Sequence, residues 1–283
     1  MPYDPKFIAG CNLQLPELGA LVQSLAFNAG NPIEHTKFSI LFHQGRGFAI
    51  ACAHNIDGAS IIKEGKIKRK SFVLDPDVPN QIQVGDKQGY HKNPWDRGHL
   101  VRRRAVHWGK LAEATQADRE SSYWTNIAPQ HEHLHDTAWG SIEDWLLELA
   151  DASDKRLCVF TGPVLLGQDP VLVNKPNEKP IQIPAGFWKI IALKHKGVLR
   201  AAAFLVWQRD YNSDKPVAFD PILEQVRITT IEFLTDLAFP NLKGADPLKF
   251  GVKLKKAARR RRAVAGTAIR KPAAVTSRDD IVL

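Results

Sequence analysis

The sequence has few cysteines and no long apolar run. Its three cysteines, Cys11, Cys52 and Cys158, are widely spaced and form no CxxC pair, which favours neither a disulfide framework nor a zinc-thiolate site and suits a reducing compartment. No apolar stretch reaches the length of about 18 residues that a membrane helix needs. The opening residues, MPYDPKFIAGCNLQLPELG, lack the basic-then-apolar order of a secretory signal. We therefore expect a soluble, unprocessed chain without a membrane partner, in the cytoplasm rather than outside the cell.

The positive charge is concentrated at one end of the chain. The formal net charge is +9, but ten Lys or Arg and two Asp lie between Lys253 and Leu283, which leaves about +1 for residues 1–252. The run KLKKAARRRR (253–262) predicts an anion-binding tail, with a solvated flexible extension as the simpler alternative. A phosphate site in the body must therefore be built locally, from arginines such as Arg97, Arg102, Arg103 and Arg104.

The chain is long enough, with 283 residues of which 44% are apolar, to bury one sizeable core. We expect an N-terminal arm packed on that core (1–34), one domain (35–252) and a basic, flexible C-terminal tail (253–283). Runs of apolar and alternating residues predict strands, and helical spacing predicts helices. The expected strands are 38–42 and 47–53, joined as an antiparallel hairpin, and 123–129, 157–165, 187–194 and 200–208. The expected helices are 109–120, 136–150, with Asp136 or Thr137 as its cap, and 228–239. The fold class is therefore α+β, with a central antiparallel sheet flanked by helices.

A long loop rich in Pro and Gly (75–95) leads to the motif Asp96-Arg97-Gly98-His99. An imidazole titrates near neutral pH, so His99 can act as a general base. On an extended strand Arg97 projects from the same face as His99 and can bind a phosphate with its fork of donors. Gly98, between them, would let a substrate backbone approach closely. These residue types predict phosphodiester hydrolysis, which also needs a cation beside the phosphate.

Candidate metal ligands follow downstream. After Asn126-Ile127-Ala128-Pro129-Gln130, His135 and Glu143 lie eight residues apart on the next predicted helix, roughly 12 Å along its axis. We infer that His135 binds a metal ion directly and that Glu143 holds a water on that metal. A zinc site of His131, His133 and His135 is an open alternative. Four further histidines are expected to be ordinary surface or core residues: His54, His91, His107 and His195.

These motifs together resemble a known family. The DRGH motif, the Asn-Ile-x-Pro-Gln strand end and the following Trp139 and Glu143 are similar to the non-specific DNA/RNA endonuclease family, which includes endonuclease G and has a ββα-metal active-site motif. The resemblance covers roughly residues 35–242. Its further landmarks are Arg69-x-x-Phe72-x-x-Asp75, Phe160-Thr161-Gly162-Pro163, Pro184-x-x-Phe187-Trp188-Lys189 and Ile231-Glu232-x-Leu234-Thr235.

The resemblance implies a role for each matching residue. His99 corresponds to the general base, and Arg97 and Arg69 to arginines that bind the substrate phosphate. Asn126 corresponds to a polar residue that supports the catalytic site. Glu143 matches the glutamate that anchors the metal-bound water. His135 departs from the pattern, because the family usually has there the Asn that binds magnesium directly. Imidazole is a softer ligand than an amide oxygen, which favours a shift of the metal preference from magnesium toward manganese or zinc-like ions.

The expected function is metal-dependent, sequence-non-specific endonucleolytic cleavage of DNA and RNA that leaves 5′-phosphates. One divalent cation is expected, Mg²⁺ first and Mn²⁺ second. The alternatives are a catalytically impaired nucleic-acid-binding module and a zinc hydrolase of another substrate. Family members are often dimers, which makes a homodimer an expectation. The segment from Phe38 to Gly58 resembles versions of the nuclease that are fused to other domains, so a sensor or protease domain, or an inhibitor, remains an open partner.

Overall fold

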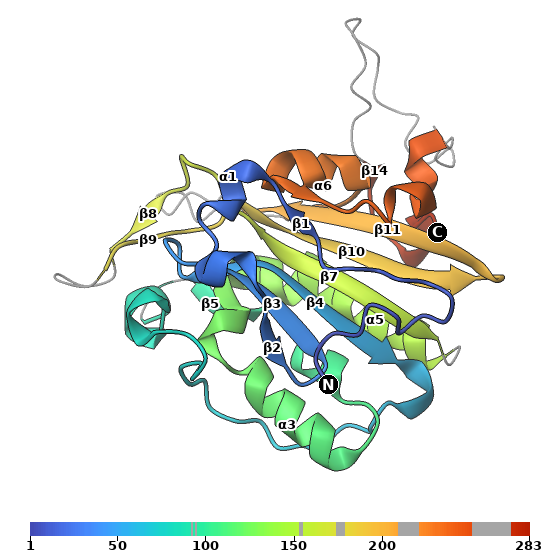
Figure 1. The fold of residues 1–283 in the computed structure, drawn as a ribbon, viewed down its shortest axis with the longest axis horizontal. Coiled ribbons are helices and arrows are strands. Elements are labelled where there is room, and N and C mark those ends of the chain that lie inside the picture. Colours follow the sequence, from blue (N-terminus) through green and yellow to red (C-terminus); the bar gives the residue numbers. More distant parts are fainter. Residues whose placement is uncertain (92, 94, 153–154, 174–178, 209–220, 251–272) are drawn as a thin grey trace, which may run out of the picture.

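The structure is a computed structural model that describes residues 1–91, 93, 95–152, 155–173, 179–208, 221–250 and 273–283. An eight-stranded antiparallel sheet runs through the molecule (Figure 1) in the order β14-β12-β11-β10-β7-β4-β3-β2. In chain order its strands are β2 (Ile33–His35), β3 (Phe38–His43), β4 (Phe48–Asp57), β7 (Arg156–Val164), β10 (Gly186–His195), β11 (Val198–Trp207), β12 (Leu223–Val226) and β14 (Ala273–Ala274).

Three two-stranded pairs and a few helices complete the fold. The pairs are β1 (Glu17–Leu18) with β13 (Leu237–Ala238), β5 (Trp95–His99) with β6 (Ile127–His131), and β8 (Val171–Leu172) with β9 (Ile181–Gln182). The helices are α1 (Ala20–Gln23), α2 (Asp86–Gly89), α3 (Leu111–Ser121), α4 (Glu132–Leu134), α5 (Gly140–Asp151) and α6 (Ile228–Thr235). None of the helices in these described segments is long and apolar enough to cross a membrane. The predicted α+β class with a central antiparallel sheet is confirmed, as is the β3–β4 hairpin.

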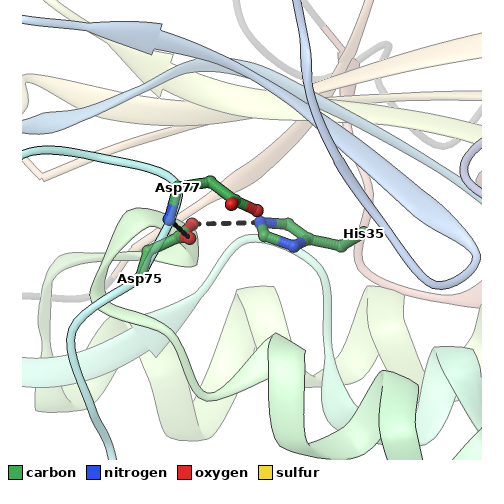
Figure 2. A group of neighbouring side chains, drawn as sticks. All are labelled: His35, Asp75 and Asp77. Atoms are coloured by element: carbon green, nitrogen blue, oxygen red, sulfur yellow. Dashed lines mark hydrogen bonds and ion pairs between the residues drawn. The ribbon is translucent and has the colours of Figure 1, made fainter.

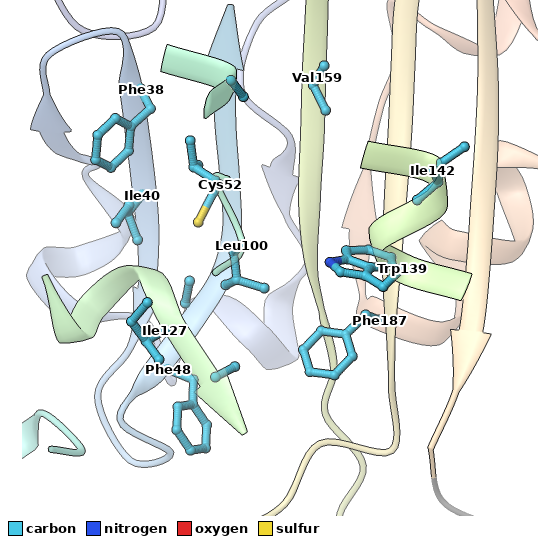
Figure 3. Close-up of a cluster of buried hydrophobic side chains, with 14 of the residues drawn as sticks. Phe38, Ile40, Phe48, Cys52, Leu100, Ile127, Trp139, Ile142, Val159 and Phe187 are labelled. Carbon is cyan, nitrogen blue, oxygen red and sulfur yellow. The ribbon is translucent and has the colours of Figure 1, made fainter. Parts of the chain in front are cut away.

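The two faces of the sheet bury separate apolar clusters because side chains alternate along a strand. On β10, Phe187 and Ile191 belong to the cluster under α5, and Trp188 and Ile190 belong to the cluster on the opposite face. Figure 3 shows the first cluster, where Trp139 and Ile142 from the helical segment lie over the sheet. The N-terminal arm and α6 cover the second face.

The helix that was predicted at 136–150 begins earlier and is not a uniform α-helix. It starts with α4 at Glu132, continues as one π-helical segment over His135–Trp139, and becomes α5 from Gly140. The expected cap at Asp136 or Thr137 is therefore wrong. A π-turn adds one residue to a turn and occurs frequently at functional sites. Here it lies between His135 and the glutamate-bearing part of the helix.

The last residues of the chain are bound to the sheet. The basic run 253–262 lies outside the described residues, but β14 pairs with β12, and Gln225 exchanges two hydrogen bonds with the backbone of Val282, of 2.8 and 2.9 Å. Ile281 and Leu283 pack against the cluster under α5. Residues 273–283 therefore pack at the edge of the sheet through apolar side chains near the end of the chain, and the expected flexibility of the tail stays a prediction.

We expect this anchor to contribute to stability. Replacing both Ile281 and Leu283 with Asp would place two charges against apolar side chains, and the free energy of unfolding should fall by about 1–3 kcal/mol. Urea denaturation measures it. Asp279→Ala is the matched control, since Asp279 is exposed in the same segment. Equal midpoints for all three proteins would show that the anchor contributes nothing.

Candidate active site

A cavity of about 610 Å³ is lined by β5, by the segment that follows it and by α5. The antiparallel pair sets Arg97 opposite Pro129 and His99 opposite Ile127. The residues that line the cavity are Arg69, Phe72, Asp96, Arg97, His99, Arg102, Arg103, Arg104, Gly140, Glu143 and Asp144. Seven of the candidate site residues that the sequence singled out, at positions 69, 97, 99, 102, 103, 104 and 143, therefore line one cavity. Five arginines against three carboxylates give the walls a positive charge, which suits a polyanion.

His99 lies at the inner end of β5 and is largely buried, with 9% of its surface exposed. The partly buried ring of Phe72 lies beside it, with ring centroids 5.4 Å apart. The guanidinium groups of Arg69 and Arg97 lie 5.8 and 5.9 Å from the centroid of the same Phe72 ring. Arg97 also donates to Asp86 of α2, with an Nε–Oδ1 distance of 3.0 Å. The long loop before β5 thus supplies a carboxylate that holds Arg97 at the cavity mouth.

Gly98 lies close against Gln130, a residue of the neighbouring strand. A side chain at this position would collide with Gln130, whose Cδ would lie 2.2 Å from an added Cβ. Gln130 is fully buried and lies opposite Asp96 in the β5–β6 pair. The glycine therefore makes room for a neighbouring side chain, and the close approach of a substrate backbone stays a prediction. The two motifs DRGH and NIxPQ are linked by this packing.

Asn126 is fully buried and does not line the cavity. Its side-chain oxygen accepts from the backbone N–H of Val101 at 2.9 Å. Its amide donates to the carbonyls of Val101 and Ser121 at 2.9 and 2.8 Å. Its own carbonyl accepts from the N–H of Leu100. Asn126 therefore braces the chain immediately after His99, which agrees with a supporting role and not with direct contact to substrate.

Glu143 lies at the cavity wall in a buried ion pair that the sequence reasoning missed. Lys189 Nζ is 2.9 Å from Glu143 Oε1, and the two side chains are only 1% and 7% exposed. Lys189 also lies over the ring of Trp139, 4.5 Å from its centroid. Burial lowers the pKa of Lys189, and the neighbouring glutamate offsets only part of that effect. Side chains alternate along β10, so Lys189 lies on the same face as Phe187, toward α5. This alternation was the sequence signal that could have placed Lys189 near Glu143.

The second oxygen of Glu143 faces Arg102. Arg102 Nε lies 3.8 Å from Oε2, beyond hydrogen-bond distance, and Arg102 Nη1 pairs with Asp144 at 2.7 Å. Arg103 is held by Asp118 at 2.7 Å, and His107 binds the same carboxylate at 2.8 Å. Burial alone would raise the pKa of Asp118, but the His107 and Arg103 contacts lower it below its usual value. Three of the cavity arginines, Arg97, Arg102 and Arg103, thus pair with carboxylates on α2, α5 and α3.

His135 is the expected metal ligand. Its side chain lies outside the described part of the structure, so its role stays a prediction. The backbone places it at the start of the π-helical segment. His131 and His133 pack against each other, with ring centroids 5.4 Å apart, but neither lines the cavity. Lys189 binds one oxygen of Glu143, and the other lies beyond hydrogen-bond distance of Arg102. The role of Glu143 toward a metal-bound water stays a prediction.

A second group with metal-ligand chemistry lies elsewhere. Figure 2 shows His35, Asp75 and Asp77, whose ligand atoms all lie within 4.8 Å of one another. None of the three lines the cavity. The oxygens of Asp75 already accept from His35 Nε2 at 3.0 Å, from Thr125 at 2.6 Å and from the N–H of Asp77 at 3.0 Å. These bonds connect β2, the long loop and the segment before β6, so we interpret the group as a structural brace.

Replacing Asp75 with Asn should lower the free energy of unfolding by about 1–3 kcal/mol, because buried donors lose a charged acceptor. Although burial raises the pKa of Asp75, its hydrogen bonds from His35 and Thr125 lower it overall. The stabilisation is therefore present above the unfolded-state pKa and is lost as pH falls through the lower folded-state value. Denaturation curves at neutral and acidic pH measure this. Asp77→Asn, at an exposed carboxylate, is the control, and an equal loss in both variants would contradict the brace.

Comparisons with known proteins agree with this geometry. The family model for DNA/RNA non-specific endonuclease matches residues 21–242. An uncharacterized protein, y4fB, of Sinorhizobium fredii is 32% identical over 69% of this chain and 30% of its own length. The human mitochondrial nuclease EXOG is 24% identical over 72% of this chain and 55% of its own length. The chain thus spans about a third to a half of the relatives it matches.

The structural comparison concerns the fold. A crystal structure of an EndoG/EndoGI complex matches with a TM-score of 0.58 and 17% identity, over 77% of this chain and 89% of the other. At that identity the likeness shows a shared architecture. The family model covers most of the chain, including the β5–β6 pair, the residues that line the cavity, and α5. The chain therefore belongs to the DNA/RNA non-specific endonuclease family, whose chemistry is hydrolysis of phosphodiester bonds.

Proposed function

We propose that this chain is a metal-dependent endonuclease that cleaves DNA and RNA without sequence preference. The observation that carries the proposal is the cavity in which Arg69, Arg97, His99 and Glu143 meet. Its positive walls favour a phosphate backbone, and backbone contacts carry no sequence information. The names of relatives that include EXOG and endonuclease G support the same function.

In the proposed reaction His99 takes a proton from the attacking water. Arg97, and Arg69 across the Phe72 ring, bind the phosphate and neutralise charge as the transition state forms. To bind it, Arg97 would exchange its bond to Asp86 for the phosphate. Asn126 holds the backbone after His99 in place. The products would carry 5′-phosphates.

The proposed metal site consists of His135 and, through water, Glu143. A divalent cation bound there would supply charge neutralisation at the scissile phosphate and its leaving oxygen. Lys189, on β10, fixes the orientation of the Glu143 carboxylate through their ion pair. Mg²⁺ is the first expectation and Mn²⁺ the second, because an imidazole is softer than the amide oxygen that the family usually has at this position.

The ligand assignment is tested by comparing the wild type with His135→Ala and His135→Asn on plasmid DNA across a titration of Mg²⁺ and of Mn²⁺. Alanine should abolish cleavage or raise the required metal concentration by more than about tenfold, whereas asparagine should restore cleavage and favour Mg²⁺. His133→Ala, two residues away and exposed, is the control. An unchanged metal requirement in the alanine variant would exclude His135 as a ligand. A wild type that binds plasmid but never cleaves would favour the impaired binding module.

A further inference from the structure

The loop that carries Arg69 is strongly basic. Residues 62–72, here called the basic loop, contain five cations and a single acid, Glu64. All five cations are exposed, namely Lys63, Lys66, Lys68, Arg69 and Lys70. Because residues 1–252 have a net charge of only about +1, this loop is a local concentration of charge on a nearly neutral body.

Both ends of the basic loop are hydrogen-bonded to neighbouring segments of the fold. At its start, the N–H of Ile62 donates to the carbonyl of His107 at 2.8 Å. Just beyond its end, the N–H of Val73 donates to the carbonyl of Ser122 at 3.2 Å. Also near its start, Glu64 pairs with Arg104 of the cavity wall at 3.6 Å. The loop is therefore held near both of its ends, and it reaches the cavity at Arg69 and Phe72.

The cations of the loop differ from those of the cavity in their partners. Arg97, Arg102 and Arg103 each pair with a carboxylate. None of the five loop cations forms an ion pair within the segments that the structure describes. An anion arriving at the loop displaces no carboxylate of these segments, so the loop charges are the ones most available to a phosphate. The seven residues from Lys63 to Arg69 can span at most about 25 Å, and a nucleic-acid strand carries one phosphate per roughly 3.4 Å of duplex axis.

We infer that the basic loop binds the backbone phosphates that flank the cleaved one, so that this chain acts on polymers in preference to very short oligonucleotides. The inference rests on the proposed function for the identity of the ligand. Arg69 and Phe72 contact the substrate at the catalytic cavity. The four lysines of the same loop contact the phosphates next to it. Lysine side chains contact phosphates as point charges and do not distinguish bases, which is consistent with binding without sequence preference.

The test is equilibrium binding in a His99→Ala background, where cleavage does not interfere. The loop variant carries Lys63→Gln, Lys66→Gln, Lys68→Gln and Lys70→Gln and retains Arg69. The control variant removes the same charge at lysines on other elements, through Lys6→Gln, Lys155→Gln, Lys179→Gln and Lys196→Gln. Each is titrated by fluorescence anisotropy against a duplex of about 30 base pairs and one of about 6, over a range of salt concentrations.

With the long duplex, the loop variant should bind more weakly, and its log–log salt slope should fall by about 0.9 for each phosphate that the loop no longer neutralises. The control should keep the slope of its parent, and the two variants should differ little on the short duplex. Equal weakening in loop and control variants, or an unchanged slope in the loop variant, would overturn the inference. Because binding is measured without turnover, a protein that binds in this manner but never cleaves would refute the proposed nuclease and leave the loop assignment intact.

Discussion

Replacing His99 with alanine is expected to slow plasmid cleavage by about two to four orders of magnitude, which is the usual contribution of a positioned general base. His99 lies beside two arginines in a positively charged cavity, on a strand whose continuation is fixed by Asn126. Binding should change little, because the phosphate contacts are assigned to Arg69 and Arg97. The rate of conversion of supercoiled to nicked plasmid, at saturating protein, measures the effect.

His195→Ala is the matched control for this experiment. His195 is an exposed histidine at the far end of β10 and does not line the cavity. Its alanine variant should cleave at the wild-type rate. Equal thermal unfolding midpoints of the two variants would exclude misfolding as the cause of a loss. Undiminished nicking by the His99 variant would refute the assignment of the base.

Replacing Lys189 with methionine should lower the free energy of unfolding by about 3–5 kcal/mol, because it leaves the buried carboxylate of Glu143 without its cation. The methionine fills a similar volume, so the loss reports on the charge and not on a cavity. Urea denaturation followed by tryptophan fluorescence measures it. Cleavage should fall in the same variant, since Glu143 loses the partner that orients it at the cavity wall.

Two further variants separate the charge effect from a packing effect. Lys194→Met, on the same strand but at its partly exposed end, should change stability by less than about 0.5 kcal/mol. The double variant Lys189→Met with Glu143→Leu should recover most of the stability, because a buried pair can often be replaced by apolar residues at little cost. It should not recover cleavage. A double variant as unstable as the single one would contradict the ion-pair explanation.

Periodicity in the sequence predicted the sheet well and the helices less well. The apolar segments at 157–165, 187–194 and 200–208 became β7, β10 and β11 with small shifts at their ends. The helical segment that carries Glu143 begins at Glu132, four residues earlier than predicted. Its first turns, EHLHDT, are polar and show no apolar stripe, and the π-segment shifts the phase of the side chains. Neither the polar first turns nor the π-segment produces the apolar spacing by which a helix is predicted from sequence.

The site divides in a similar way. Arg97 and His99 could be placed together because they are two residues apart on one strand, and Arg69 and Glu143 followed from the family resemblance. Lys189, Asp86 and Asp144 could not be assigned, because their contacts depend on how distant elements pack. A lysine inside the otherwise apolar β10 was still a usable signal, since a buried cation requires a partner. The packing of Gly98 against Gln130 could not be predicted, because Gln130 comes from another strand.

The proposed nuclease activity is tested most directly by incubating the purified chain with supercoiled plasmid and, in parallel, with a long RNA, each with a divalent cation and with an excess of chelator. We predict that both nucleic acids are degraded without a preferred sequence when the cation is present, and that the chelator stops both reactions. Retention of the DNA without any cleavage, or degradation that the chelator does not affect, would contradict the proposed metal-dependent nuclease.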